Sequence, residues 1–341
     1  KLKEAHEKGK DLKVFASGLA VSIFRDQSTR TRYSFKAAAN LLGLDVDDFD
    51  EKKSQVKHGE TLLETVNMIS FLTRAIGIRD DIYLGLGHRY MIEVSKALDW
   101  GFKNKIFSQR PTIINLQSDE DHPSQSLSDL CHLTNYFGSL ENLRGKKMVM
   151  SWAHSPSYGK PLSVPQGFIA LLSRFGVDLT LAYPEGYDLI PEIINQTKIQ
   201  AKKSGGHFKI VHDIAQAFSG AEVVYPKSWA PFWVMKERTR LLKMDDELDL
   251  KELEKKTLAE NAKHQDWTCS EKLMKLTKKG SALYMHCLPA DISGMSCEKG
   301  EVDKNVFEKY RKETYLQAGY KPFVIAALIL LGDSRLESLI T

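Results

Sequence analysis

The sequence predicts an α/β protein made of two domains, each a doubly wound parallel sheet covered by helices. Its 341 residues exceed what one domain of ordinary size needs. Hydrophobic residues make up 42% of the chain and charged residues 27%, as in a globular protein with a substantial core. Short apolar stretches alternate with helical patterns along both halves, which is typical of parallel sheets covered on both faces.

The first half contains two clear pairs of alternating elements. We expect a strand at Leu19–Phe24, then a helix over Ser28–Leu42, where apolar and small residues recur at helical spacing until Gly43. A second helix is expected over Thr61–Thr73, directly before a strand at Ala75–Ile78. The other elements expected in this half are a strand at Thr112–Leu116 and a helix over Ser124–Phe137.

The second half repeats the alternation, and we place the boundary between the halves near residue 140. Its expected helices cover Val164–Phe175 and Ile190–Ser204, and a last apolar helix starts at Pro322. Its expected strands are Lys147–Trp152, Asp178–Ala182, Phe208–Val211, Glu222–Tyr225 and Ala282–His286.

Charge, apolar runs and cysteines exclude several classes of protein. The 48 basic and 44 acidic residues give a net charge of +4, too small a surplus to argue for nucleic acid. The apolar run Pro322–Leu331 is too short to span a bilayer, and we expect no secretory signal. The four cysteines form no CxxC pair, so we expect neither zinc nor disulfides, and a cytoplasmic protein. The sequence opens at Lys1 without a methionine, and whether an N-terminal segment precedes it stays open.

A cluster of hydroxyl and guanidinium groups lies where the first strand ends and the next helix begins. At the N-terminus of a helix, free backbone N–H groups and the positive end of the helix dipole face outward. Ser28, Thr29 and Thr31 add hydroxyl donors, and Arg30 adds a planar fork suited to phosphate oxygens. The pattern predicts a phosphate site without glycines, although a serine N-cap followed by solvated arginines is the simpler alternative.

Four ordered blocks resemble the aspartate and ornithine transcarbamylases. The Ser-Thr-Arg-Thr-Arg run at 28–32 is similar to their carbamoyl phosphate signature, and 54–61 to the loop that they lend to a neighbouring subunit. His-Pro-Ser-Gln at 122–125 and His-Cys-Leu-Pro-Ala at 286–290 are similar to two further blocks. The stretches at 158–166, 227–229 and 286–291 resemble the YgeW-type transcarbamylases in particular, which implies a knotted second domain.

The resemblance implies a carbamoyltransferase that uses carbamoyl phosphate and a small amino compound, with no metal or organic cofactor. Residues 1–139, completed by a C-terminal helix over 322–341, would bind carbamoyl phosphate, and 140–321 the acceptor. It also implies a homotrimer with shared active sites, to which Gln55 contributes from a neighbouring chain. By the same resemblance, the phosphate is bound by Ser28, Thr29, Arg30 and Thr31. The catalytic groups, which contact the carbonyl oxygen, are Arg79, His122 and Thr31. The NH2 group is bound by Gln125 and the Leu288 carbonyl, and Cys287 completes the carbamoyl phosphate site beside the acceptor.

Each of these residues also has a plainer interpretation when taken alone. Arg79 lies beside Asp80 and Asp81, so it could form a surface ion pair. His122 could be a loop histidine bonded to the backbone, and Gln125 an ordinary polar residue of a first helical turn. The ordered blocks favour the site over these alternatives.

The acceptor half departs from the ornithine enzymes. Lys227, followed by Ser228 and Trp229, stands where that family has an acidic residue, and its Ser-Met-Gly block is absent. Lys160 and Lys321 also lie where its acceptor residues lie. We therefore expect neither ornithine nor aspartate, but an acceptor with a carboxylate or carbonyl group, and a short diamino acid stays open.

Two other functions stay open. A nucleotide-dependent oxidoreductase needs a glycine-rich turn after a strand, and Gly85-Leu86-Gly87 lacks the third glycine. A transcarbamylase-like subunit that binds or regulates without catalysis is compatible with an acceptor pocket that matches no known one. A phosphate-release assay with carbamoyl phosphate and a panel of amines separates an enzyme from such a subunit.

Overall fold

The computed structural model describes residues 1–26, 28–50 and 59–336, and it divides the chain into two compact units. Unit 1 comprises Lys1–Ser124 and Tyr320–Thr341, and unit 2 comprises Gln125–Gly319. The division therefore runs through the start of a helix, α5 (Pro123–Phe137), and not through the loop near residue 140. One reason is that Asp129 of α5 accepts a hydrogen bond from Gln317, which ties most of α5 to unit 2.

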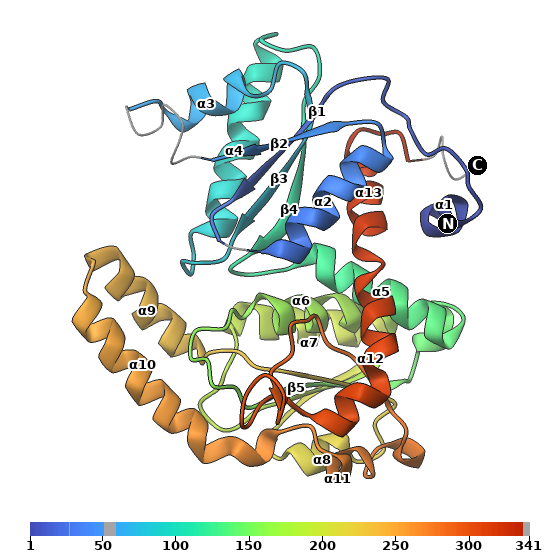
Figure 1. Cartoon of the computed structure of the whole chain (residues 1–341), viewed down its shortest axis with the longest axis vertical. Helices are drawn as coiled ribbons and strands as arrows, with labels where there is room; N and C mark the ends of the chain where they lie inside the picture. Colours follow the sequence, from blue (N-terminus) through green and yellow to red (C-terminus); the bar gives the residue numbers. More distant parts are fainter. Residues whose placement is uncertain (27, 51–58, 337–341) are drawn as a thin grey trace. The chain divides into compact units, whose positions relative to one another are not determined.

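Unit 1 contains a four-stranded parallel sheet in the order β2-β1-β3-β4 (Figure 1). The neighbours β1 and β3 are not consecutive in the chain, so a crossover joins them, as in doubly wound sheets. The strands are β1 (Leu19–Phe24), β2 (Asp45–Phe49), β3 (Thr73–Asp80) and β4 (Thr112–Ser118). The helices that accompany them are α1 (Leu2–Glu7), α2 (Thr29–Leu41), α3 (Leu62–Met68), α4 (Gly87–Lys103) and α13 (Lys321–Gly332).

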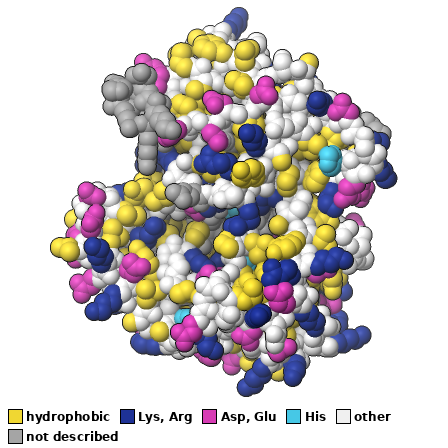
Figure 2. Space-filling model, in the orientation of Figure 1, with side chains coloured by type: hydrophobic (Ala, Val, Ile, Leu, Met, Phe, Trp, Pro, Cys, Tyr) yellow, Lys and Arg dark blue, Asp and Glu magenta, His cyan; other side chains and the backbone are white. Residues whose placement is uncertain are grey.

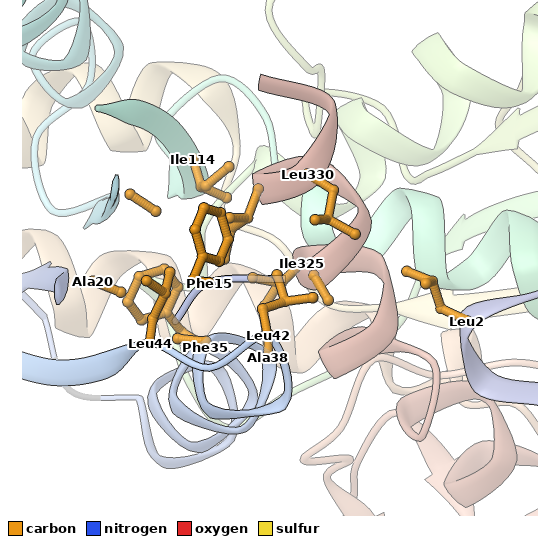
Figure 3. Close-up of a cluster of buried hydrophobic side chains, with 14 of the residues drawn as sticks. Leu2, Phe15, Ala20, Phe35, Ala38, Leu42, Leu44, Ile114, Ile325 and Leu330 are labelled. Carbon is orange, nitrogen blue, oxygen red and sulfur yellow. The ribbon is translucent and has the colours of Figure 1, made fainter. Parts of the chain in front are cut away.

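Apolar side chains cover both faces of this sheet. On one face, buried residues of α2 and α13 pack against Ala20, Ala75 and Leu116 of the strands (Figure 3). On the other face, residues of α3 and α4 pack against Ile76 and Ile78. Because alternate residues of β3 supply the two cores, the strand is buried on both sides, as its near-continuous apolar sequence requires.

Unit 2 contains a five-stranded parallel sheet in the order β7-β6-β5-β8-β9, with α6 and α7 on one side and α8 and α11 on the other in Figure 1. Its strands are β5 (Lys147–Trp152), β6 (Asp178–Ala182), β7 (His207–Val211), β8 (Val223–Lys227) and β9 (Leu283–Tyr284), and β10 (Ile292–Ser293) pairs separately with β11 (Val302–Asp303). Its helices besides α5 are α6 (Ser163–Leu172), α7 (Pro191–Ser204), α8 (Ile214–Phe218), α9 (Phe232–Met244), α10 (Glu247–Asn261), α11 (Glu271–Met274) and α12 (Lys304–Ala318).

The predicted fold class is confirmed, and so are most of the predicted elements. The expected strands Leu19–Phe24, Lys147–Trp152 and Asp178–Ala182 have the bounds that the sequence indicated. The helix expected over Thr61–Thr73 is shorter, because α3 ends at Met68 and Thr73 already belongs to β3. The strand expected over Ala282–His286 is also shorter in the structure.

The segment Lys304–Gly332 is long and apolar enough to cross a membrane, judged by length and composition alone. It consists of two helices, α12 in unit 2 and α13 in unit 1. Within α13, Ile325 and Ile329 are fully buried in the core of unit 1. This burial explains the apolar sequence as that of a core helix.

Candidate active site

The first turn of α2 carries the predicted phosphate-binding residues. Ser28 is the N-cap, but its side chain makes no capping hydrogen bond to the helix. Thr31 is buried and Arg30 is exposed, so the segment offers both an enclosed hydroxyl and an accessible guanidinium. Thr29 begins the helix, whose first backbone N–H groups have no intrahelical acceptor. This end of α2 can therefore donate several hydrogen bonds to an anion.

Arg79, at the end of β3, is held by acidic and amide side chains. Its Nη2 lies 2.9 Å from Asp26 Oδ2, its Nε also donates to Asp26, and its Nη1 donates to Gln117. Asp81 Oδ2 lies 3.3 Å from Nη2 and accepts from Gln117 Nε2 at 2.6 Å. Arg79 thus forms the ion pair that the simpler interpretation expected, but it does so with Asp26 of the loop before α2 as well as with Asp81.

The carboxyl group of Asp81 is perturbed by this arrangement. Burial raises its pKa to about 7, and although the charge of Arg79 opposes this shift, the nearby Asp26 carboxylate adds to it. Two carboxyl groups therefore share one guanidinium near neutral pH. The sequence drew attention to Asp81 only as a surface partner and did not indicate Asp26 or Gln117.

His122 follows β4 and is buried. Burial, followed by the positive charges of Lys321, Arg79 and Arg30, holds the pKa of His122 well below its ordinary value. The ring is therefore neutral at physiological pH. It is hydrogen-bonded to the Leu116 backbone, as the simpler interpretation of His122 expected, and its Nδ1 lies 3.3 Å from Ser124 Oγ. Residues from three other segments of unit 1 lie within electrostatic reach of His122, and Lys321 is one of them.

The placement of Lys321 differs from the expectation that it lines the acceptor site beside Lys160 and Lys227. Lys321 is the first residue of α13, is buried, and lies in unit 1. Its charge helps to lower the pKa of His122, and α13 packs in the core of unit 1. The lysine therefore adds to the positive potential near His122.

Gln125 lies in the first turn of α5 and is buried. Its Nε2 donates to Asp129 Oδ1 at 2.7 Å, one helical turn further along. Since the amide nitrogen is directed at Asp129, the amide oxygen is directed away from it and is the group that can accept from a ligand.

Cys287 and Leu288 follow β9 in unit 2. The backbone N–H of Leu288 donates to His286 Nδ1 at 2.9 Å, and Leu288 has a φ of 52°, a left-handed conformation that is uncommon outside glycine. His286 Nε2 in turn lies 3.1 Å from Glu301 Oε2. These contacts hold the Leu288 backbone in its unusual conformation, which is the situation often found at functional sites.

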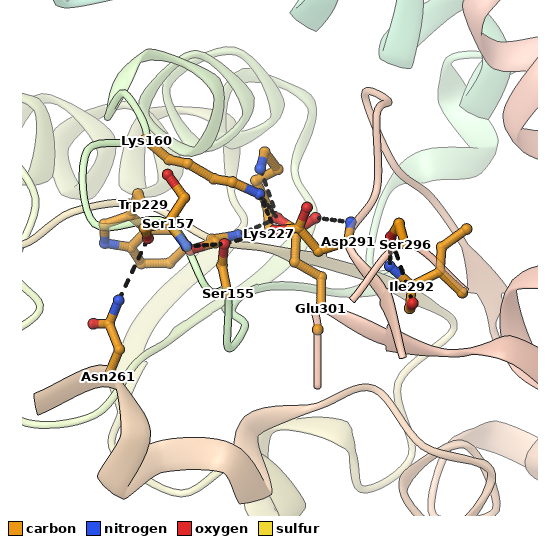
Figure 4. Close-up of polar contacts among 12 residues, drawn as sticks. Ser155, Ser157, Lys160, Lys227, Trp229, Asn261, Asp291, Ile292, Ser296 and Glu301 are labelled. Atoms are coloured by element: carbon orange, nitrogen blue, oxygen red, sulfur yellow. Dashed lines mark hydrogen bonds and ion pairs between the residues drawn. The ribbon is translucent and has the colours of Figure 1, made fainter. Parts of the chain in front are cut away.

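Lys160 and Lys227 point toward two carboxylates, Glu301 and Asp291 (Figure 4). Lys227 Nζ lies 2.6 Å from Glu301 Oε1, and Lys160 pairs with Asp291 and lies 3.4 Å from Glu301. Burial alone raises the pKa of Glu301, but the charges of Lys227, His286 and Lys160 hold it well below its usual range. Two positive and two negative charges therefore meet here.

This pairing revises the expectation that Lys227 gives the acceptor site a positive potential. The acidic group that is missing at position 227 is supplied by Glu301, which is fully buried. The Ser228 backbone N–H also donates to Glu301, at 2.7 Å. The two lysines and two carboxylates balance, so the cluster has no net positive charge that would repel a cationic acceptor.

Trp229 lies in the core of unit 2 with 1% of its surface exposed. Its Nε1 donates to the Tyr187 carbonyl at 3.0 Å, and its own carbonyl accepts from Trp152 Nε1 at 2.9 Å. Its polar groups are thus satisfied within the protein, and the ring supports the segment that carries Lys227 and Ser228.

Three further observations concern metal ligands, surface charge and Gln55. Within residues 1–26, 28–50 and 59–336, no group of three or more His, Cys, Asp or Glu side chains is placed to hold a metal ion. Basic and acidic side chains are interspersed over the face seen in Figure 2, without a large field of one sign. Gln55, expected to act on a neighbouring chain, lies outside the described residues.

Comparison with known proteins agrees with this architecture. Residues 1–135 match the aspartate/ornithine carbamoyltransferase carbamoyl-P binding domain, and 162–331 match the Asp/Orn binding domain. The carbamoyltransferase-family protein YgeW of Escherichia coli (strain K12) is 62% identical over 318 residues, covering 93% of this chain and 80% of that protein. The N-succinylornithine carbamoyltransferase of Bacteroides thetaiotaomicron is 27% identical over 78% of this chain and 74% of its own length.

Solved structures show the same fold. A mutant N-acetyl-L-ornithine transcarbamylase, complexed with carbamyl phosphate and N-succinyl-L-norvaline, has a TM-score of 0.74 and 21% identity, covering 97% of this chain and 93% of its own. The ornithine carbamoyltransferase from Pyrococcus furiosus has a TM-score of 0.72 and 25% identity, covering 96% and 88%. With family models matching both domains and a relative of 62% identity, the chain belongs to the aspartate/ornithine carbamoyltransferase family.

Proposed function

We propose that this carbamoyltransferase binds carbamoyl phosphate on unit 1 and transfers its carbamoyl group to a small amino compound. The observation that carries the proposal is the grouping of Arg30, Arg79 and Lys321 around the neutral ring of His122, next to the first turn of α2. A dianionic phosphate fits such a site, because oriented donors and cations replace its hydration.

The chemistry assigns a role to each side chain. Ser28, Thr29 and Arg30 hold phosphate oxygens, and Thr31, Arg79 and His122 donate to the carbonyl oxygen, which gains negative charge as an uncharged amine attacks the carbon. The C–N bond forms, the bond from the carbonyl carbon to the phosphate oxygen breaks, and phosphate leaves with that electron pair. The amine nitrogen loses one proton, which the departing phosphate takes up. Gln125 Oε1 and the Leu288 carbonyl accept hydrogen bonds from the carbamoyl NH2 group and orient it.

Arg79 must change partners for this role. In the structure Asp26 occupies its Nε and one of its terminal nitrogens. Carbamoyl phosphate offers the guanidinium a developing oxyanion, and Asp26, which is part of the same loop as Ser28, releases it on binding. The neighbouring Asp81, with a pKa raised to about 7, takes up part of the change in charge.

For the acceptor, we propose the cluster of Lys160, Lys227, Asp291 and Glu301 as the recognition site. Lys160 and Asp291 are its more exposed members, with 18% and 24% of their side chains accessible, whereas Glu301 is inaccessible. A carboxylate on the acceptor can pair with Lys160 in exchange for Asp291. Relatives named for N-succinylornithine and N-acetylornithine support an acceptor of amino-acid type without identifying it.

The test is phosphate release from carbamoyl phosphate in the presence of a panel of amines. The panel contains ornithine, N-acylated ornithines, short diamino acids and amino dicarboxylates, and each reaction is analysed for the N-carbamoyl product. We expect at least one amine to raise phosphate release and to yield a product in equal amount. If every amine leaves phosphate release at the rate without enzyme, the proposed reaction is wrong.

We further propose that the active enzyme is a homotrimer in which Gln55 completes the site of a neighbouring chain. Unit 1 supports self-association, because α3 and the turn after it expose Leu63, Met68, Phe71 and Leu72 with 41%, 53%, 48% and 71% of their surfaces accessible. Exposed apolar residues gathered on one element often mark an interface.

Mixing two inactive chains tests the shared site. A chain carrying Gln55→Ala and one carrying Arg30→Ala, each damaged in a different contribution, regenerate intact sites when they assemble together. Activity in the mixture, with trimers measured by sedimentation, is the expected result. Mixed trimers that stay inactive would exclude a shared site.

A knotted second domain and a cytoplasmic location are also proposed. The segment after β8 lies against the loop after β5, since Ala230 N donates to the Lys160 carbonyl and Ala153 N to the Lys227 carbonyl. These contacts place the two segments side by side, and the threading itself is proposed from the resemblance to knotted transcarbamylases. A knot makes refolding from the fully unfolded, untied chain slower than refolding of a chain whose knot persists, which interrupted refolding experiments measure.

A further inference from the structure

The buried carboxylate of Asp129 contacts two glutamines at once. Gln125 Nε2 donates to Asp129 Oδ1 at 2.7 Å, and Gln317 Nε2 donates to the same oxygen at 2.6 Å. The exposed fractions are 2% for Gln125, 1% for Asp129 and 0% for Gln317, so bulk water does not compete for these groups. Burying a carboxylate costs free energy unless hydrogen bonds replace its hydration, as these two amide groups do in part.

The contact to Asp129 decides which way both amides face. An ionised carboxylate only accepts hydrogen bonds, so each glutamine must turn its NH2 group to it and its carbonyl oxygen away. For Gln317 the structure shows the result, because its Oε1 accepts from the His286 backbone N–H at 3.1 Å. For Gln125 the same rule directs Oε1 away from Asp129.

Both glutamines lead to the groups that the proposed function places on the carbamoyl NH2. Gln125 Oε1 is one acceptor, and the Leu288 carbonyl is the other. Gln317 fixes the backbone of His286, and the His286 ring accepts from the Leu288 N–H at 2.9 Å. One carboxylate therefore controls the orientation of one acceptor directly and the backbone position of the other through Gln317.

We propose that Asp129 is a positioning residue that makes the enzyme selective for a carbamoyl over an acetyl group, by fixing the amide orientation of Gln125 and, through Gln317, the loop of Leu288. The inference rests on the proposed function of that site. The chemical class that it selects is a primary amide next to a phosphoryl group, and the class that it rejects is the matching methyl ketone.

Replacing Asp129 with asparagine should release this orientation. Asparagine can turn either its oxygen or its NH2 group toward the two glutamines, and its oxygen is a weaker acceptor than a carboxylate, so the orientation of the glutamines is no longer obligatory. If Gln125 turns, its NH2 group faces the NH2 group of the ligand, and two donors meet. If Gln317 turns, the hydrogen bond to His286 is lost and the Leu288 loop is released.

Two stable ligands measure the selectivity without an acceptor. Phosphonoacetamide carries the amide, and 2-oxopropylphosphonate carries a methyl group in its place, so their affinities differ only through the NH2 group. We expect the wild-type protein to prefer the amide, and Asp129→Asn to lose about 10- to 100-fold of that preference while its affinity for the methyl ketone changes little. Asp266→Asn, an exposed aspartate of the same unit, is the matched control.

A double-mutant cycle separates positioning from general damage. Gln125→Leu removes the acceptor that Asp129 orients, so adding Asp129→Asn to it should lower the preference by much less than it does alone. Should Asp129→Asn fail to fold by near-UV circular dichroism, Gln317→Met tests the second branch, and its preference for the amide should also fall.

The outcomes distinguish this inference from the proposed function. A wild-type protein that binds neither ligand overturns the proposed donor site itself, and one that binds both equally overturns the proposed roles of Gln125 and Leu288. A wild-type preference that persists in Asp129→Asn or, where that variant is unfolded, in Gln317→Met, overturns the role of Asp129 and leaves the donor site intact. Equal loss of affinity for both ligands shows a structural role only and also overturns it.

Discussion

Replacing Glu301 with glutamine should destabilise unit 2 strongly, because it removes the countercharge of a buried lysine. Glu301 has no accessible surface and accepts from Lys227 Nζ at 2.6 Å, from the Ser228 N–H at 2.7 Å and from the Asp291 N–H at 2.9 Å. Glutamine has nearly the same shape but no charge, and its NH2 group must face at least one of these donors.

The magnitude follows from the lysine that is left behind. At 2.6 Å and an effective dielectric constant of about 20, the attraction between Lys227 and Glu301 is roughly 6 kcal/mol. Part of this is recovered when Lys227 turns to Asp291 or to water. Breaking a buried pair by removing one partner costs about 3–5 kcal/mol, and we expect a loss in that range for Glu301→Gln.

Urea unfolding followed by tryptophan fluorescence measures this loss. Trp152, Trp229, Trp233 and Trp267 lie in unit 2 and only Trp100 in unit 1, so the signal reports mainly on unit 2. Glu298→Gln is the matched control, because Glu298 is exposed and lies three positions away in the sequence. A variant in which Lys227→Met and Glu301→Leu are combined should be less destabilised than Glu301→Gln, since it leaves no unpaired charge.

The pH dependence provides a second check on Glu301. Its folded-state pKa is depressed, so its contribution is fully present above the ordinary glutamate value of about 4.3 and is lost as the pH falls below that value toward the folded-state pKa. The difference between wild type and Glu301→Gln should therefore shrink below about pH 4. A Glu301→Gln protein within about 0.5 kcal/mol of the Glu298→Gln control at pH 7 would refute the reasoning.

Other expected outcomes follow from the same geometry. Arg30→Lys should weaken carbamoyl phosphate binding by about 2 kcal/mol, roughly 30-fold, because an ammonium cannot hold two phosphate oxygens as a guanidinium does. Arg32→Lys is the control and should bind like wild type, because the Arg32 guanidinium pairs with Asp48. Calorimetry compares the two variants, and equal carbamoyl phosphate affinities would remove Arg30 from the site. Leu330→Ala should lower the free energy of unfolding by about 2–5 kcal/mol, because it leaves a cavity in the core under α13. Leu331→Ala should lower it far less, because 61% of the Leu331 surface is exposed. Similar losses for both variants in urea unfolding would contradict the packing. NMR titration of His132 should give a pKa of about 4, lowered by burial. Because the unfolded state then binds more protons than the folded state, the free energy of unfolding of unit 2 should fall by about 3 kcal/mol as the pH drops from 6.5 through 4. A measured pKa near 6.5 would contradict the burial of His132.

Periodicity and turn residues predicted the parallel sheets well, but not every element. The strand β2 was missed because its sequence, Asp-Val-Asp-Asp-Phe, is mostly acidic and half exposed at the edge of the sheet. The helix α4 was missed because it begins at Gly87, a residue that normally argues against a helix. Gly87 is required there, since a Cβ atom would lie 1.9 Å from the Asp80 carbonyl oxygen.

The sequence indicated candidate donor-binding residues through their motifs, but it could not indicate their partners in the structure. Asp26 and Gln117 approach Arg79 from positions 53 and 38 residues away, and the period of a strand or helix carries no information about such contacts. Glu301 is the clearest case: it lies 74 residues from Lys227, in a segment for which the sequence predicted neither an element nor a role. A lysine interpreted as unpaired in the sequence was paired in the structure, so the charge of the acceptor site could not be predicted from position 227 alone.

Isotope transfer tests the central claim most directly. Wild-type protein is incubated with ¹³C-labelled carbamoyl phosphate and a mixture of ¹⁵N-labelled amino acids that includes ornithine, its N-acyl derivatives and short diamino acids. We predict a new ¹³C resonance of a ureido carbon, split by one-bond coupling to ¹⁵N, that grows in step with phosphate and is absent with Arg30→Ala. Label that appears only in cyanate and bicarbonate, at the rate seen without protein, would contradict carbamoyl transfer by this chain.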